Sequence, residues 1–327
     1  MSHLPARITS RLKVPLIVAP MLRVSGPELV SAVCAAGAIG AFPTANASSA
    51  EELGHWLDRI EEAARLHTAA CRSTPAPYAA NLIMRGPRTV EHLPVLVEHG
   101  VEVVITSVGS PAPVVGPLHD IGAIVLSDVA TLAHARKAVA AGADGLVLLT
   151  AGAGGQTGWM NPLAFTRAVR EFFDGPVVLA GGIADGHALR AAVTLGADLG
   201  YMGTRFIATP ESMATPAYRD MLVTSTLDDV VLTSAFTGLP SSMLAPSIRA
   251  AGLDPQALDE TVTAATAAEL YGGGSDGSHP RRWTDVVSAG HSVSGVDAVR
   301  PAREIVVRTL AEYGEGPIAP DEVLDAL

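Results

Sequence analysis

Residues Val177–Phe206 read VVLAGGIADGHALRAAVTLGADLGYMGTRF and contain one complete repeating unit. Pro176–Ala180 is an apolar run of strand length, and two glycines follow it. Gly186–Leu195 has the length and Ala/Leu content of a helix, and Gly196 stands where helices commonly end. A second apolar run, Leu199–Met202, comes directly afterwards. This order predicts a strand, a helix and a second, parallel strand.

The same unit recurs through the preceding residues. We predict strands at Leu16–Ala19, Ala38–Phe42, Tyr78–Ile83, Val101–Thr106, Ala123–Leu126, Gly145–Leu149, Pro176–Ala180 and Leu199–Met202. Helices are expected between them, including Gly26–Ala36, Ser49–Ala69, Thr131–Ala141, Pro162–Phe173 and Gly186–Leu195. Eight such units in a row favour an α/β fold of the closed (β/α)₈ TIM-barrel type. The first strand lacks a following Gly-x-Gly-x-x-Gly, which argues against a Rossmann domain.

The pattern changes near residue 210, so three parts are expected. Residues 1–209 would form the barrel, 210–285 a helical lid or insertion, and 286–327 a segment that returns to the barrel. Within these parts, Gly272–Arg282 is a Gly/Ser/Pro-rich loop and Val296–Tyr313 has the pattern of a helix.

Composition limits the class of protein and its partners. The net charge of −11 argues against nucleic acid, because binding phosphate backbones needs a basic surface. No apolar stretch is long enough to span a membrane, and no export signal is seen, so we expect a cytoplasmic protein with a small-molecule substrate. Cys34 and Cys71 are expected to be small buried residues. The oligomeric state stays open, with a homodimer as one option.

Glycines end the last two predicted strands. Gly181 and Gly182 follow one strand, and Gly203 with Thr204 follows the next. TIM barrels often bind a phosphate at these two loops, because exposed backbone N–H groups can approach it closely. Tight turns alone would also explain the glycines.

Other strand ends carry polar groups that would suit a flat heteroaromatic ring. Asn81 and Ser107 end two strands, and Ser127 with Asp128 ends a third. A Gly-rich loop, TAGAGGQTG at Thr150–Gly158, follows the sixth strand. Amide and hydroxyl groups at the edge of a ring, with backbone close to its face, are what a flavin needs. Each polar residue alone is equally typical of a turn or a helix cap.

Five motifs in this order resemble the nitronate monooxygenase family, formerly called 2-nitropropane dioxygenases. They are APM at Ala19–Met21, AANL at Ala79–Leu82, AGAGGQTG at Ala151–Gly158, AGGIADG at Ala180–Gly186 and MGTRF at Met202–Phe206. The resemblance implies a flavoprotein that holds FMN non-covalently. It implies FMN contacts from Pro20, Met21, Asn81, Ser127, Ala153, Gly154, Gly155, Gly181, Gly182, Gly203 and Thr204.

One position departs from the family pattern. Members that accept neutral nitroalkanes usually have a catalytic histidine in the AGG loop, where this chain has Gln156. A carboxamide cannot remove a proton near neutral pH, although it can donate a hydrogen bond to a nitro or carbonyl oxygen. His291, in SAGHSVSG, stands where the family often has glutamine, so an exchange of the two residues would keep a base. A lone loop histidine is equally typical of a surface position. Tyr201 and Trp159 are further candidates for the pocket wall, or core residues.

Three functions follow from this reading. The first is a flavin monooxygenase that oxidises a nitronate or another stabilised carbanion with O₂, with Gln156 and backbone N–H groups of its loop holding the substrate's oxygens. The second is an NAD(P)H-dependent flavin reductase of the enoyl-thioester or quinone reductase kind. The third is an FMN-binding protein without turnover. No lysine ends a strand, which disfavours a Schiff-base aldolase, and no ligand spacing predicts a metal.

Overall fold

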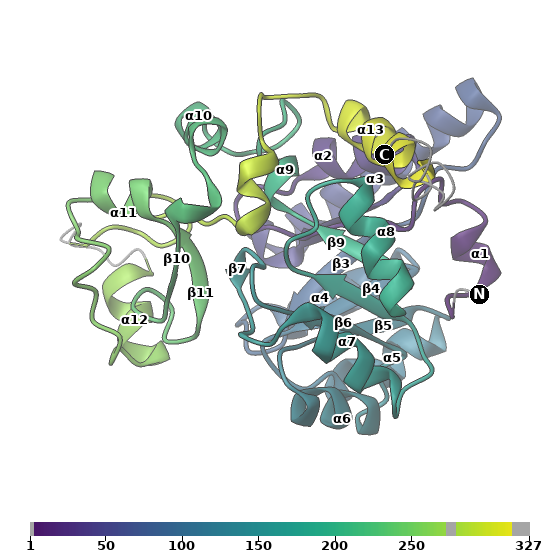
Figure 1. Ribbon diagram of the computed structural model, residues 1–327. Coiled ribbons are helices and arrows are strands. Elements are labelled where there is room, and N and C mark those ends of the chain that lie inside the picture. Colours follow the sequence, from purple (N-terminus) through teal and green to yellow (C-terminus); the bar gives the residue numbers. More distant parts are fainter. Residues whose placement is uncertain (1–2, 273–278, 316–327) are drawn as a thin grey trace, which may run out of the picture.

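Eight parallel strands form a closed barrel in the computed structural model, which describes residues 3–272 and 279–315. Around the barrel the strands follow the order β1-β2-β3-β4-β5-β6-β8-β9, with helices outside them (Figure 1). Their bounds are β1 Leu16–Val18, β2 Ile39–Pro43, β3 Tyr78–Ile83, β4 Val103–Ser107, β5 Ile124–Val129, β6 Gly145–Leu149, β8 Val177–Ala180 and β9 Leu199–Met202. The predicted (β/α)₈ barrel is confirmed. The predicted 272–282 loop and the last segment, 286–327, lie partly outside the described residues.

Side chains of each strand point alternately into the barrel and outward toward the helices. Side chains at every second position pack in the barrel interior, as Ala79, Leu126 and Val147 do. Their neighbours, such as Val104 and Val125, pack on the outer face beneath the helices. Both faces of each strand are therefore buried, which explains the nearly continuous apolar runs of the sequence.

The helices between the strands match the predicted segments. They are α2 Pro27–Ala36, α3 Ala50–Cys71, α4 Thr89–Glu98, α5 Ala112–Asp120, α6 Leu132–Ala140, α7 Pro162–Arg170 and α8 Gly186–Leu195, with short α1 Ala6–Thr9 before β1 and α9 Thr204–Ile207 after β9. Gly37 and Gly196 end α2 and α8 in the left-handed conformation, with φ of 101° and 112°. The expected returning helix forms as α13, Ala302–Gly314, which packs against α2 and α8.

The insertion after the barrel contains strands as well as helices. The helices are α10 Pro216–Thr224, α11 Ala245–Ala250 and α12 Ala264–Tyr271. Strands β10 Val230–Thr233 and β11 Ser241–Leu244 pair antiparallel, and β11 also pairs with β7, Gly155–Gln156, from the loop after β6. Figure 1 shows this unit beside the barrel. Helices alone were expected here, and this three-stranded sheet was not predicted, because the segment lacks the repeating strand–helix pattern and the third strand comes from a distant loop. The division into three parts stays a prediction.

The insertion has a small core of its own and a second cluster that joins it to the barrel. Phe236, Met243 and Val286 belong to the first. The second cluster combines insertion residues such as Leu222 with Ile207 of α9. The insertion is therefore packed on the barrel rather than separate from it.

Two smaller expectations have clear outcomes. Cys34 is buried as expected, but Cys71 is exposed at the end of α3, so the prediction for Cys71 was wrong. Across residues 3–272 and 279–315, none of the helices combines the length and the apolar character needed to cross a bilayer.

Candidate active site

A cavity of about 1200 Å³ opens at the carboxyl ends of the barrel strands. Residues at the ends of β3, β4, β5 and β9 form its floor, and the loops after β6, β8 and β9 form its walls. Insertion residues, including Leu232, Pro240 and Trp283, close it from above. Typical ligand pockets measure roughly 300–1,000 Å³, so this cavity has room for a cofactor together with a substrate.

Every residue that the sequence analysis expected to contact a cofactor lines this one cavity. They are Pro20, Met21, Asn81, Ser127, Ala153, Gly154, Gly155, Gly181, Gly182, Gly203 and Thr204. These residues come from six separate segments at the carboxyl ends of strands, so only the closed barrel brings them together. Their binding roles stay predictions.

The two glycine loops after β8 and β9 form an open cradle. Gly181 and Gly182 have φ of 128° and 72°, a backbone conformation that favours glycine. A Cβ at Gly181 would collide with Thr150, whereas the space beside Gly182 is open. Oγ1 of Thr204 accepts a hydrogen bond from Gly290 N–H at 2.9 Å, which leaves its own proton for a ligand. This arrangement suits an anionic group such as a phosphate.

The loop that contains Gln156 is held between the barrel and the insertion. Gln156 lies on β7 opposite Ser241 of β11, and its side chain is half-buried at the cavity wall. The N–H of Gly155 donates to Ser288 Oγ at 2.6 Å, and that of Ala153 donates to Thr150 O at 3.1 Å. These two N–H groups therefore hold the loop itself together. The expectation that N–H groups of this loop stabilise charge on a substrate stays a prediction, which these two groups do not serve.

Strand β5 places Ser127 and Asp128 in different environments. Leu126 packs in the barrel interior and Val125 packs under the helices. By the same alternation Ser127 points outward, where its Oγ lies 3.1 Å from the Thr106 hydroxyl that donates to it. Asp128 points into the barrel mouth and lines the cavity. Both residues line the cavity, and the role predicted for Ser127 stays a prediction, but by this alternation it is the Asp128 side chain that points inward.

Asp128 and Tyr201 each carry a buried polar atom that lacks a hydrogen-bond partner among the described residues. These atoms are Oδ1 of Asp128 and the hydroxyl oxygen of Tyr201. Burial raises the pKa of the Asp128 carboxyl to about 7. Burial, followed by the nearby Asp128 carboxylate, also raises the pKa of Tyr201 well above its usual value, so the phenol stays neutral. Both groups line the cavity and are available to a ligand.

Asn81 and Ser107 form a satisfied pair on the same floor. Nδ2 of Asn81 donates to Ile105 O and lies 3.2 Å from Ser107 Oγ. These contacts fix the orientation of the carboxamide at the carboxyl end of β3. The contact of Asn81 with a ring edge stays a prediction.

The structure does not bring His291 into the cavity. Its backbone N–H donates to Gly152 O at 2.9 Å, its imidazole packs against Gly152, and its side chain is exposed. His291 is absent from the cavity lining, unlike its neighbours Ala289 and Ser292. The geometry therefore does not support the expectation that His291 acts as the catalytic base in place of a histidine at position 156. Trp159 does line the cavity, at an edge where it remains 76% exposed.

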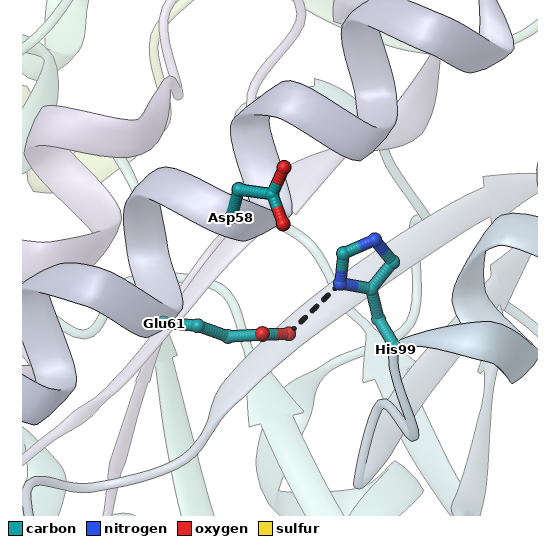
Figure 2. A group of neighbouring side chains, drawn as sticks. All are labelled: Asp58, Glu61 and His99. Atoms are coloured by element: carbon teal, nitrogen blue, oxygen red, sulfur yellow. Dashed lines mark hydrogen bonds and ion pairs between the residues drawn. The ribbon is translucent and has the colours of Figure 1, made fainter.

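A separate group of ionisable side chains lies on the outer helices. Asp58 and Glu61 of α3 lie close to His99 (Figure 2). Oε1 of Glu61 is 3.0 Å from Nδ1 of His99, within hydrogen-bond distance. Glu61 also accepts a hydrogen bond from Tyr78. None of these residues lines the cavity. Their contacts tie α3 to the end of α4 and to β3, which is a structural role.

The sequence model of the nitronate monooxygenase family matches residues 6–312. The chain belongs to this family. Its members are oxidoreductases, and this confirms the predicted class of enzyme, a flavoprotein oxidoreductase on a TIM barrel. A nitronate monooxygenase of Pseudomonas aeruginosa is 31% identical over 310 residues, covering 79% of this chain and 87% of that protein.

Other similar proteins have different names. A (3aS,4S,5R,7aS)-5-hydroxy-7a-methyl-1-oxo-octahydro-1H-indene-4-carboxyl-CoA dehydrogenase of Mycobacterium tuberculosis is 29% identical over 236 residues, or 70% of this chain. The chain spans only 62% of the length of that relative. Among solved structures, FabK of Thermotoga maritima has a TM-score of 0.79 at 26% identity, covering 99% of this chain and 100% of that one. Nitroalkane oxidase of Streptomyces ansochromogenes has a TM-score of 0.74 at 26% identity, covering 94% and 99%.

The residues of this family member fit a flavin nucleotide. The open space at Gly182 and the free proton of Thr204 would accommodate its phosphate. The floor offers an oriented amide at Asn81 and two unpartnered polar atoms, on Asp128 and Tyr201, for the polar edge of its ring. When bound, the flavin would supply the electron-accepting chemistry that amino-acid side chains lack.

Asp128 should make the stability of the ligand-free protein depend on pH. Its folded pKa of about 7 exceeds its ordinary value of 3.8, so folding favours the protonated carboxyl, and this stabilisation is lost as the pH rises from about 4 to 7. We expect Asp128→Asn to raise the free energy of unfolding by roughly 1–3 kcal/mol at pH 8, and by much less at pH 4.5. Urea unfolding of both apoproteins at the two pH values measures this. An equal change in the free energy of unfolding at pH 8 and at pH 4.5 would contradict the raised pKa of Asp128.

Proposed function

We propose that this protein is an FMN-dependent oxidoreductase that oxidises a nitronate, or a similarly stabilised carbanion, and passes the electrons to O₂. The observation that carries the proposal is the position of Gln156. It lines the cavity that has the glycine cradle, and the exposed His134 of α6 is the one histidine among the described residues that line this cavity. A substrate that is already an anion needs no base to remove a proton. Gln156 can then hold its oxygens by donating N–H bonds.

The charges around the cavity also favour an anionic substrate. Arg85, Lys137 and Arg282 line it, and Asp128 is the one acidic residue among its described lining residues. This contrasts with the whole chain, in which 33 acidic residues outnumber 22 basic ones. A cleft with positive charges in an otherwise negative protein attracts anions and raises their local concentration.

A second candidate is an NAD(P)H-dependent flavin reductase that acts on a thioester or a quinone. The large cavity and the similarity to FabK over nearly the whole chain favour it. The mycobacterial relative, named as a dehydrogenase of a CoA compound, supports the same class of substrate. In this reading the cavity would admit the nicotinamide and the substrate in turn.

Anaerobic visible spectra separate the two candidates. We expect the purified protein to carry FMN and its absorbance near the flavin maximum to bleach when propyl-2-nitronate is added. Bleaching by NADH or NADPH alone would favour the reductase. A protein that neither retains nor binds FMN would contradict both.

Gly203→Ala tests the phosphate cradle. Gly203 has φ of −112°, and an added Cβ would make only ordinary contacts, 3.4 Å from Ala19 Cβ and from Met21 Sδ. The fold should tolerate the methyl group, but it would stand beside the approaching phosphate, so we expect FMN affinity to fall at least about tenfold. Fluorescence titration with FMN measures this. Gly54→Ala, on α3 with open space around its Cβ, is the matched control and should bind FMN normally.

Two further variants compare the positions that the sequence analysis named as catalytic. His291→Ala should leave turnover of the nitronate within about twofold, because its side chain lies outside the cavity. Gln156→Ala should lower kcat/KM about ten- to a hundredfold, the effect of removing a hydrogen bond to a charged group. Steady-state kinetics with both variants gives the comparison. A large loss in His291→Ala with normal Gln156→Ala would restore His291 as the base.

A further inference from the structure

The floor of the cavity is the level at which the barrel interior changes from apolar to polar. Below it, the inward positions hold residues such as Leu126 on β5 and Leu199 on β9. Two residues further along the same strands, the inward positions hold Asp128 and Tyr201. Strands β3 and β4 end in the same way, with Asn81 and Ser107.

The polar residues of this floor differ in how their hydrogen bonds are satisfied. Asn81 and Ser107 bond each other, whereas Asp128 Oδ1 and the Tyr201 hydroxyl lack partners within the described chain. A buried polar atom without a partner costs free energy, and such atoms are rare in native structures. Two of them facing one cavity are groups that a bound ligand can partner.

The position of the phosphate cradle shows which ligand lies over Asp128. The cradle follows β8 and β9, and Asp128 lies near the end of β5, which is two strands from β8 and three from β9 around the closed barrel. If the proposed function is correct, a flavin with its phosphate in the cradle would extend its ring across the barrel mouth. Asp128 and Tyr201 would then meet the polar edge of the ring, and Gln156 and the insertion would border the rest of the cavity. Asp128 therefore faces the flavin rather than the substrate.

Few charged groups surround the Asp128 carboxyl. Tyr201 of β9 faces it and is neutral, and the neighbouring strands β4 and β6 contain no ionisable side chain. Helix α6 contributes His134 and Lys137 to the cavity lining, and both are exposed. Helix α5 contributes His119, which pairs with Asp144 at the opposite end of β5.

The remaining cavity cations lie elsewhere. Arg85 is exposed after β3, and Arg282 of the insertion donates to Phe236 O. None of these groups forms an ion pair with Asp128. Its protonation is therefore governed by burial and by whatever charge develops on the ligand above it.

We propose that Asp128 is a redox-linked proton acceptor, in contact with the polar edge of the flavin ring together with Tyr201. Two electrons that enter the ring from the substrate add negative charge next to the carboxylate. Oδ1 of Asp128 then binds one proton from solvent, and releases it when the two electrons leave to O₂. Each electron pair is thus accompanied by one proton at Asp128, in addition to any proton on the ring itself.

Midpoint potentials of the holoenzyme as a function of pH test this proposal. Wild type and Asp128→Asn are compared from pH 5.5 to 9, since the ring's own protonation is common to both. At low pH, where Asp128 is protonated in both redox states, the midpoint potentials of the wild type and the variant should differ by a constant amount. At higher pH the midpoint potential of the wild type should fall increasingly below that of the variant. The expected change is up to tenfold in the reduction equilibrium constant per pH unit, which is about 30 mV for two electrons. Parallel lines over the whole range would overturn the proposal.

Controls separate this inference from the proposed function. Ser107→Ala changes the same floor without removing a titrating group. Its plot of midpoint potential against pH should therefore stay parallel to that of the wild type. Absence of bound flavin in the wild type would defeat the proposed function, whereas bound flavin with parallel lines would defeat the Asp128 proposal alone. If Asp128→Asn does not retain flavin, reduced-minus-oxidised infrared spectra of the wild type at pH 8 decide. A new protonated carboxyl band upon reduction is expected, and its absence would overturn the proposal.

Discussion

Closure of a parallel sheet is the constraint on which the rest of this structure depends. Because all eight strands run in the same direction, all their carboxyl ends meet at one face of the barrel. Because side chains alternate, only every second residue at that face points inward. These two facts place Asn81, Ser107, Asp128 and Tyr201 on one floor, although they are far apart in sequence. The site is a consequence of the fold and not of any single motif.

Strand positions and glycine loops could be predicted from the sequence because they are local properties. The apolar runs gave all eight barrel strands within a few residues, and the glycine pairs gave the cradle of Gly181 and Gly203. The inward direction of the Asp128 side chain was predictable too, by counting alternate residues along β5 from Leu126. Whether a strand residue stands at an odd or an even position decides which face its side chain occupies.

The features that were missed depend on contacts between distant segments. Strands β10 and β11 lie in a stretch that lacks the repeating strand–helix pattern of the barrel, and β7 exists only because Gly155 and Gln156 pair with β11. The position of His291 is fixed by its bond to Gly152 and by the packing of the neighbouring glycines. A loop resemblance cannot show which side of the loop a side chain will occupy.

The pairing of β7 with β11 makes the Gln156 loop a part that the barrel and the insertion share. The posture of Gln156 is set by a strand of the insertion and by Ser288 beyond it, and Gly290 of the same segment donates to Thr204 of the cradle. A substitution in segment 288–290 therefore affects both sides of the cavity, so the choice of substrate is mechanically coupled to the shape of the rest of the pocket.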